Sequence, residues 1–403
     1  MRIAYFSPLP PAPSGIAVYS AALLHTLRTQ AEITAFVDDA LLPQIAPDFP
    51  VSVRAISTFR GPLAERFHTC VYQMGANIRF HAAIYATLHR YPGITVLHDL
   101  NLASFFGEMY LRIGQTARYT RLVAATYGQS GLEYIRAAHR GEIAYDVAHY
   151  PLFEPVVQRS LGTLVHSKFA EAQLRRYCPS AAIGQTHLLA DIAAPRIDTA
   201  EARAQLDYAA TDLIVAAFGY AAPQKRLDQL LIAVARLRPE FPQLRLAIVG
   251  KVIDGYDLAA HVTALGLADI TRITGYVDDA ELHTYLAATE IGANLRYPTL
   301  GESSATLVAL MAAGKPTLVS AVDAFAELPD TACVKIAVDA AEEAEIATAL
   351  RTLLTDAALR QQIGAQARAY AESHCSPSRV AQQYLQFIET KLKLPSQPAA
   401  RIV

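Results

Sequence analysis

Short apolar runs alternate with segments of helical periodicity along nearly the whole chain. Such a run is too short for a buried helix and suits a strand that is covered on both faces, as in a parallel sheet. Each run leads into a helical stretch rather than a tight turn, and this order predicts a mainly parallel sheet with helices on both faces. The predicted strands are 2–6, 33–37, 69–73, 94–98 and 163–166, and then 213–218, 244–249, 270–274, 291–295, 316–320 and 334–337.

The size of the chain predicts two such α/β domains. Its 403 residues are 52% hydrophobic, which is enough for two cores, since single domains mostly have about 100–200 residues. The periodicity lapses around Pro195, so we expect an N-terminal domain over 1–195 and a C-terminal domain over 196–376. Ser376 and Pro377 predict the start of a last helix that ends near residue 393.

Charge and cysteine usage exclude several classes of protein. A formal net charge of −2 is unlike the basic excess of nucleic-acid-binding proteins. The four cysteines are far apart, without the spacing of a zinc site or a disulfide framework. We find no signal-peptide pattern and no apolar run of the ~18–20 residues that a bilayer requires. We therefore expect a cytoplasmic protein, with peripheral contact at the inner face of a membrane left open.

The turn after the predicted strand 291–295 suits an anionic ligand. Gly301 and Glu302 lead into a helix that Ser303 or Ser304 caps and that stops at Gly314. A helix N-terminus offers unpaired backbone N–H groups, and here two hydroxyls and a carboxylate lie beside them. This set predicts a site for a phosphorylated, hydroxyl-rich ligand, although Glu302 could equally be a capping carboxylate.

A second turn of this kind follows the predicted strand 213–218. It contains Gly219 and the adjacent cations Lys225 and Arg226, just before a helical stretch. Because a cation at a helix N-terminus opposes the helix dipole, its presence there indicates a bound anion. The alternative is that both charges are simply solvated on the first turn of the helix.

The N-terminal half has polar residues where predicted strands end. Ser14 and Gly15 open a helix after a proline-rich loop, and His98 and Asp99 end the strand 94–98. At the carboxyl edge of a parallel sheet such side chains face the crevice where ligands bind. The alternatives are a structural turn at Ser14 and an ordinary buried histidine at position 98.

A mostly helical insert with six tyrosines occupies residues 101–157. These rings could pack the core of the insert, or they could form a surface for an acceptor molecule.

Taken in order, the segments resemble the retaining GT-B glycosyltransferases of family 4, the glycosyl transferases group 1. The matching pieces are Ser7 to Ile16, Leu97 to Asp99, Phe218 to Arg226, Thr274 to Val277, and Gly301 through Pro316. The resemblance implies two doubly wound, Rossmann-like domains whose parallel sheets face across a cleft, with the last helix packed back on the N-terminal domain. It also implies that the donor lies mostly on the C-terminal domain.

The resemblance assigns roles to individual residues. For catalysis it implies His98, Lys225 and Glu302, and for the donor diphosphate it implies Ser14, Gly15, Gly219, Lys225, Arg226, Ser303, Ser304 and Thr306. For the donor sugar it implies His98, Asp99, Arg296 and Glu302, for the nucleotide base Tyr276 and Val277, and Asn77 and His81 are acceptor candidates.

Two departures from the family pattern stand out. Tyr220 follows Gly219 where the family usually has arginine, and Arg226 follows Lys225 where it has glycine. Ala309 stands where the second glutamate of the family motif belongs, and the first is shifted by one residue to Glu302. The contact to the ribose is therefore left unassigned.

The expected function is transfer of a hexosyl group from a UDP- or GDP-sugar to a glycan, a glycolipid or a small molecule. No cofactor is expected, and no metal, because the aspartate pairs at 38–39 and 278–279 are adjacent and their side chains would diverge on a strand. The alternatives are an inactive GT-B partner subunit and a nucleotide-sugar epimerase or hydrolase. The base, the sugar, the acceptor and the oligomeric state are not encoded in any motif that we recognise.

Overall fold

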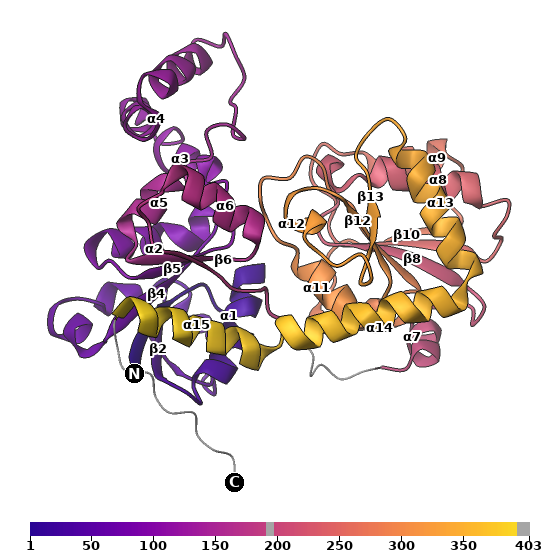
Figure 1. Cartoon of the computed structure of the whole chain (residues 1–403), viewed down its shortest axis with the longest axis horizontal. Coiled ribbons are helices and arrows are strands. Elements are labelled where there is room, and N and C mark those ends of the chain that lie inside the picture. Colours follow the sequence, from indigo (N-terminus) through magenta and orange to yellow (C-terminus); the bar gives the residue numbers. More distant parts are fainter. Residues whose placement is uncertain (191–196, 393–403) are drawn as a thin grey trace. The chain divides into compact units, whose positions relative to one another are not determined.

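The computed structural model describes residues 1–190 and 197–392 and divides the chain into two compact α/β units (Figure 1). The first unit consists of residues 1–189, 300–303 and the chain from Pro377 onward, and the second consists of 190–299 and 304–376. The predicted boundary near Pro195 and the predicted helix end at 393 lie outside the described residues.

The first unit is built on a seven-stranded parallel sheet with the order β3-β2-β1-β4-β5-β6-β7. Its strands are β1 (Arg2–Phe6), β2 (Glu32–Val37), β3 (Ser52–Ala55), β4 (Thr69–Met74), β5 (Ile94–Leu97), β6 (Gly162–Val165) and β7 (Ile183–Gln185). Its helices are α1 (Gly15–Leu27), α2 (Ile78–Arg90), α3 (Ala103–Tyr110), α4 (Thr116–His139), α5 (Glu154–Arg159), α6 (Lys168–Tyr177) and α15 (Pro377–Leu392).

The last described helix, α15, belongs to the first unit. It packs with α1 against one face of the sheet, and the hydroxyls of Tyr19 and Tyr384 are 2.7 Å apart. Strands β6 and β7 carry Gly162 and Gly184 under the ring of Phe387, and a Cβ at Gly184 would lie 2.6 Å from that ring. The two glycines therefore leave room for the helix to pack directly on the strands.

The second unit is built on a six-stranded parallel sheet with the order β10-β9-β8-β11-β12-β13. Its strands are β8 (Leu213–Phe218), β9 (Leu244–Val249), β10 (Thr271–Ile273), β11 (Ile291–Asn294), β12 (Thr317–Ser320) and β13 (Val334–Ile336). Its helices are α7 (Thr199–Gln205), α8 (Leu227–Leu237), α9 (Leu258–Ala264), α10 (Asp279–Ala288), α11 (Ala305–Ala312), α12 (Asp323–Ala326), α13 (Glu342–Thr355) and α14 (Ala357–His374).

Each sheet is covered on both faces, as the alternation of strands and helices predicts. In the second unit one apolar cluster joins the sheet to α8, α9 and α13, and other clusters lie under α7, α10, α11 and α14 (Figure 1). The eleven predicted strands are confirmed within one or two residues at their ends, while the short edge strands β3 and β7 were not predicted.

The helical insert is confirmed as α3, α4 and α5, with a break in α4 where Gly128 takes a φ of 65°. Its tyrosines mostly pack within the insert: the rings of Tyr134 and Tyr150 stack at 3.9 Å, and Tyr119 is buried. Tyr145 is exposed.

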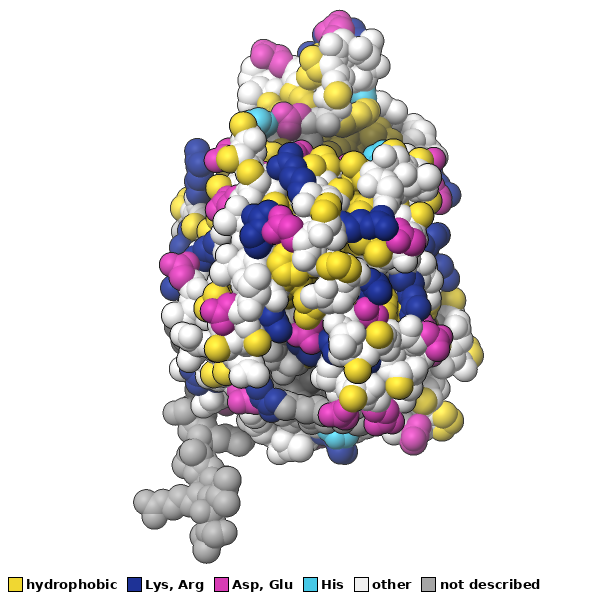
Figure 2. All heavy atoms as spheres, turned by 90° about the vertical axis from the view of Figure 1, so that its right-hand side faces the viewer, with side chains coloured by type: hydrophobic (Ala, Val, Ile, Leu, Met, Phe, Trp, Pro, Cys, Tyr) yellow, Lys and Arg dark blue, Asp and Glu magenta, His cyan; other side chains and the backbone are white. Residues whose placement is uncertain are grey.

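On the face in Figure 2, acidic and basic side chains are interspersed. Within residues 1–190 and 197–392, no helix combines the length and the apolar character needed to span a bilayer.

Candidate functional site

The loop after β8 brings backbone and charge together at the carboxyl edge of the second sheet. Gly219 has a φ of +95°, and its N–H donates to the carbonyl of Val249 at 2.9 Å. A Cβ at Gly250 would lie 2.2 Å from the Gly219 carbonyl oxygen, so only glycine permits this approach of the two loops. The loop then forms a short 3-10 turn, Pro223–Lys225, before α8 begins.

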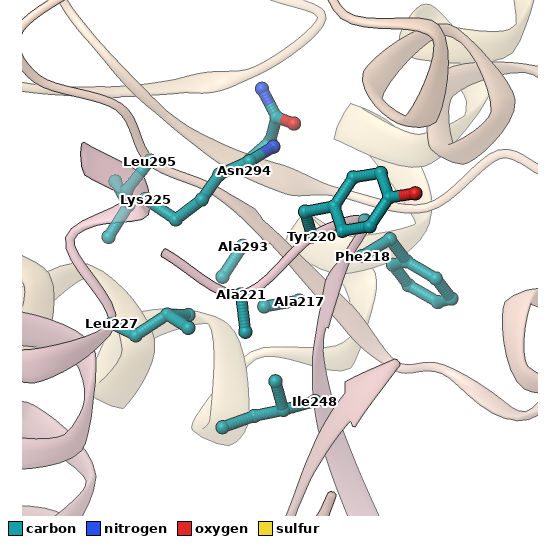
Figure 3. Close-up of a pocket in the computed structure, with 11 residues that line it drawn as sticks. Ala217, Phe218, Tyr220, Ala221, Lys225, Leu227, Ile248, Ala293, Asn294 and Leu295 are labelled. Carbon is teal, nitrogen blue, oxygen red and sulfur yellow. The ribbon is translucent and has the colours of Figure 1, made fainter. Parts of the chain in front are cut away.

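Lys225 extends from that turn back toward Gly219. Its Nζ lies 3.7 Å from the position that a Cβ on Gly219 would take, and the Cγ2 of Thr306 lies 3.8 Å from the same position. The stem of Lys225 runs along a cavity with largely apolar walls (Figure 3), which include Ala217, Ala221 and Leu227. The ammonium group is thus held beside the first turn of α11.

Arg226, the second predicted cation, has a different partner. Its guanidinium forms an ion pair with Glu342, which is 1% exposed, and this hydrogen-bonded pairing raises the pKa of Arg226. The pair joins the start of α8 to the start of α13. The guanidinium of Arg226 is thus already engaged by a carboxylate of its own unit.

The N-terminus of α11 is capped by Ser304 rather than Ser303. The Oγ of Ser304 accepts from the N–H of Leu307 at 3.2 Å and donates to the Oδ1 of Asn294 at 2.9 Å. The hydroxyl of Thr306 lies 3.1 Å from that Oγ and 3.4 Å from the same Oδ1. These bonds tie the first turn of α11 to the carboxyl end of β11.

The sequence analysis did not identify Asn294 as a candidate site residue. It is the polar last residue of an otherwise apolar strand, Ile291–Asn294, and only 4% of it is exposed. A polar residue in that position of a parallel strand is a signal for a ligand-facing group.

Two other residues predicted to bind the donor, Arg296 and Glu302, lie in the chain segment between β11 and α11. Glu302 accepts the N–H of Leu300 at 2.7 Å within the 300–303 turn, where Gly301 has a φ of +80°. The guanidinium of Arg296 lies over the ring of Phe325 at 5.4 Å.

The predicted base-binding residues follow β10, where Gly275 has a φ of +74°. Tyr276 is 76% exposed, whereas Val277 packs partly into the core. An exposed aromatic ring beside a sheet edge is suited to stacking on a base.

In the first unit, Gly75 marks the place where several predicted residues meet. A Cβ there would lie 2.6 Å from the side chain of Ile16, 3.0 Å from the Oδ2 of Asp99 and 3.2 Å from the ring of His81. That carboxylate oxygen also accepts the N–H of Ala76 at 2.8 Å. The start of α1, the start of α2 and the end of β5 therefore converge on this glycine.

Helix capping accounts for two of the side chains in this region. Ser14 caps α1 by accepting the N–H of Ile16 at 3.3 Å, and Asn77 caps α2 by accepting the N–H of Arg79 at 3.0 Å. The Nδ1 of His81 lies 2.9 Å from the carbonyl of Asn77, and burial lowers the pKa of His81 to about 4. Asn77 therefore has a structural role as the cap of α2, whether or not it also contacts an acceptor.

His98 belongs to a buried network that sequence reasoning did not foresee. Its Nε2 lies 2.7 Å from the Oε1 of Gln73, which can only accept, so Nε2 carries the proton. Its Nδ1 then accepts from the Nε2–H of His166 at 3.1 Å. Burial, followed by the nearby His166, holds the pKa of His98 well below its usual range. The imidazole is therefore neutral at pH 7, and both of its nitrogens have protein partners.

Comparison with known proteins relates this arrangement to a family. Residues 198–370 match the family model "Glycosyl transferases group 1". A curated relative, the phosphatidyl-myo-inositol mannosyltransferase of Mycobacterium leprae, is 32% identical over 173 residues, which make up 42% of this chain and 44% of that protein. The match therefore spans less than half the length of that relative.

Solved structures align over nearly the whole chain. HepE of Anabaena, in complex with UDP and glucose, aligns with a TM-score of 0.63 and 18% identity, covering 97% of this chain and 100% of that one. Sucrose-phosphate synthase of Thermosynechococcus elongatus aligns with a TM-score of 0.68 and 18% identity, covering 98% and 100%. At this identity the likeness is one of fold. Residues 198–370 are thus similar to the glycosyl transferases group 1 domain, and the chain has the GT-B fold.

Proposed function

We propose that the protein is a retaining glycosyltransferase that moves a hexosyl group from a nucleoside-diphosphate sugar to an acceptor. The observation that carries the proposal is the candidate anion site of the second unit, where the ammonium group of Lys225 and Thr306 in the first turn of the capped helix α11 lie 3.7 and 3.8 Å from the Cβ position of Gly219. This site lies inside the segment that matches the glycosyl transferases group 1 model. We further propose that the first unit is the acceptor-side domain and that the second unit is the nucleotide-sugar-binding domain.

The chemistry that such a site must perform is charge stabilisation. As the glycosidic bond to the diphosphate breaks, negative charge grows on the phosphate oxygens, and fixed donors or cations stabilise it in a water-poor site. Lys225 supplies the cation, and the backbone N–H groups at the start of α11 supply hydrogen bonds. The hydroxyls of Ser304 and Thr306, which donate to the Oδ1 of Asn294, hold this turn in place. Gly219 allows the phosphate to approach the backbone.

The sugar is assigned to groups on other segments. We propose that Glu302 and Arg296 bind hydroxyls of the donor sugar, with Asp99, and that Tyr276 stacks on the base. His98 contacts the sugar as a neutral, fixed group rather than by proton transfer, since both ring nitrogens are engaged by Gln73 and His166. Attack from the same face as the leaving group then accounts for retention without a covalent intermediate.

The donor and the acceptor are proposed by class. We propose a UDP- or GDP-sugar as the donor. One solved neighbour is in complex with UDP and glucose, and the curated relative is named as a mannosyltransferase, so glucose and mannose are candidate sugars. The name of that relative also makes a glycolipid a candidate acceptor, beside glycans and small molecules. We propose that the reaction takes place in the cytoplasm, at the inner face of a membrane if the acceptor is a lipid.

A calorimetric screen of UDP, GDP and their glucose and mannose derivatives tests the proposal. We expect one nucleoside diphosphate to bind, its sugar to be consumed only when an acceptor is added, and the product to keep the anomeric configuration of the donor, as read by NMR. Turnover of the donor alone would favour an epimerase or a hydrolase. The absence of binding by any donor would favour an inactive partner subunit.

A further inference from the structure

The buried amide of Asn294 has an unused hydrogen-bond donor. Its Oδ1 is occupied by the hydroxyls of Ser304 and Thr306. Its Nδ2 is shielded from solvent and has no hydrogen-bond partner among residues 1–190 and 197–392. Buried donors in folded proteins are nearly always paired, because an unpaired donor has lost its bonds to water and gained none. An unpaired one beside a candidate ligand site therefore calls for a partner from outside the chain.

The position of Asn294 indicates which partner that is. It lines the same cavity as Gly219 and Lys225, and Figure 3 shows its side chain at the end of the cavity that the Lys225 ammonium reaches. The cavity measures about 10 Å³, which is roughly the room for one oxygen atom. The methyl Cγ2 of Thr306, whose hydroxyl bonds Asn294, lies 3.8 Å from the Gly219 Cβ position, and Lys225 Nζ lies 3.7 Å from it. An oxygen held there would meet an amide donor and an ammonium group together.

The charges of the loop explain why a neutral donor is needed. The terminal phosphate of a free nucleoside diphosphate, the leaving group of the reaction, carries about −1.5 to −2 charges at pH 7. Arg226 is already paired with Glu342, and Lys225 contributes a single positive charge. Neutral N–H donors can hold the remaining charge without the cost of burying a second cation.

We propose that Asn294 is a diphosphate-binding residue, whose Nδ2 donates to an oxygen of the terminal phosphate of the donor nucleotide. This inference rests on the proposed function, and it gives the Nδ2 group of Asn294 a role that neither the family motif nor the start of α11 requires. The Oδ1 of Asn294 stabilises the helix start, and Nδ2 binds the ligand.

The test separates these two uses of the amide. Asn294→Asp keeps an acceptor for Ser304 and Thr306 but replaces the donor with a charged oxygen that repels a phosphate. Asn294→Ala removes the donor without adding a charge, so it separates loss of the hydrogen bond from repulsion and also serves in case the first variant does not fold. Affinities for UDP and UMP, and for GDP and GMP, are measured by calorimetry. We expect diphosphate binding to weaken about 10- to 100-fold, as for loss of a hydrogen bond to a charged group. Monophosphate binding should change less than about threefold.

Asn101 provides a matched control. It is also a buried asparagine, but its Oδ1 accepts from the N–H of Ala103 and its Nδ2 donates to the carbonyl of Val147. Asn101→Asp should lower the melting temperature and leave the ratio of diphosphate to monophosphate affinity unchanged.

Two outcomes overturn the inference in different ways. If the wild-type protein binds UDP or GDP and folded Asn294 variants keep the same affinity ratio, a water molecule or a purely structural role explains the amide, and the proposed function stands. If the wild-type protein binds neither diphosphate, the proposed function fails, and the assignment of Asn294 fails with it.

Discussion

Replacement of Lys225 by methionine tests the charge on which the proposed chemistry depends. Methionine keeps an unbranched stem among the apolar walls of the cavity and removes only the ammonium group. Two unit charges ~4 Å apart interact by about 4 kcal/mol at an effective dielectric constant of 20, and single preorganised donors contribute about 2.7–4 kcal/mol to the transition state. A loss of that size corresponds to a fall in kcat of about 10²-fold or more.

The assay follows release of nucleoside diphosphate from the donor found by calorimetry, with kcat and KM determined separately. The control is Arg226→Met, which leaves Glu342 buried without its partner and should cost about 3–5 kcal/mol of stability. Adding Glu342→Gln removes the unpaired charge and should restore much of the melting temperature. An unchanged kcat for Lys225→Met would refute the assignment, and a fall in kcat for the folded Arg226 and Glu342 double variant would place the second cation in the site.

Four further predictions follow from single features of the structure. Glu302→Gln should weaken discrimination between two donor sugars, seen in their relative kcat/KM, while nucleoside diphosphate still binds. Ser304→Ala should lower the free energy of unfolding in urea by about 0.5–2 kcal/mol, because it removes the cap of α11. EDTA should leave activity within a factor of about two, because charge stabilisation is assigned to side chains and a helix N-terminus. Burial lowers the pKa of His166 to about 4; the unfolded chain therefore binds its proton first, and stability should fall as the pH drops from about 6.5 toward 4.

Each of these has a result that contradicts it. For Glu302, a melting temperature lower by the equivalent of ~1 kcal/mol with unchanged sugar selectivity would leave the carboxylate only the structural role of holding the 300–303 turn. For EDTA, complete loss of activity that magnesium restores would require a metal. A urea midpoint unaltered in Ser304→Ala would mean that the cap contributes nothing. If His166→Asn shows the same fall of melting temperature between pH 7.5 and 4.5 as the wild-type protein, other groups account for the acid sensitivity.

The class of fold could be predicted from the sequence because it depends on local patterns. The run Leu213–Phe218 is apolar throughout and is followed at once by a turn and a helical stripe, so both its type and its bounds could be predicted. The edge strands β3 and β7 could not, because Ser52–Ala55 and Ile183–Gln185 are short and mixed in polarity. They are strands because β2 and β6 offer them a hydrogen-bonding edge.

The candidate site divides in the same way. That a helix starts at the Gly-Glu-Ser-Ser turn, and that a cation lies in the loop after β8, follows from neighbours along the chain, since capping and turn chemistry act over a few residues. Only the tertiary structure separates Lys225 from Arg226, because Glu342 lies 116 residues away along the chain. The pairing of Asn294 with Ser304, and of His98 with Gln73 and His166, likewise depends on which strand ends the sheet order brings together. Hydrogen bonds and ion pairs form between groups that are close in space, and a sequence pattern states only which groups are close along the chain.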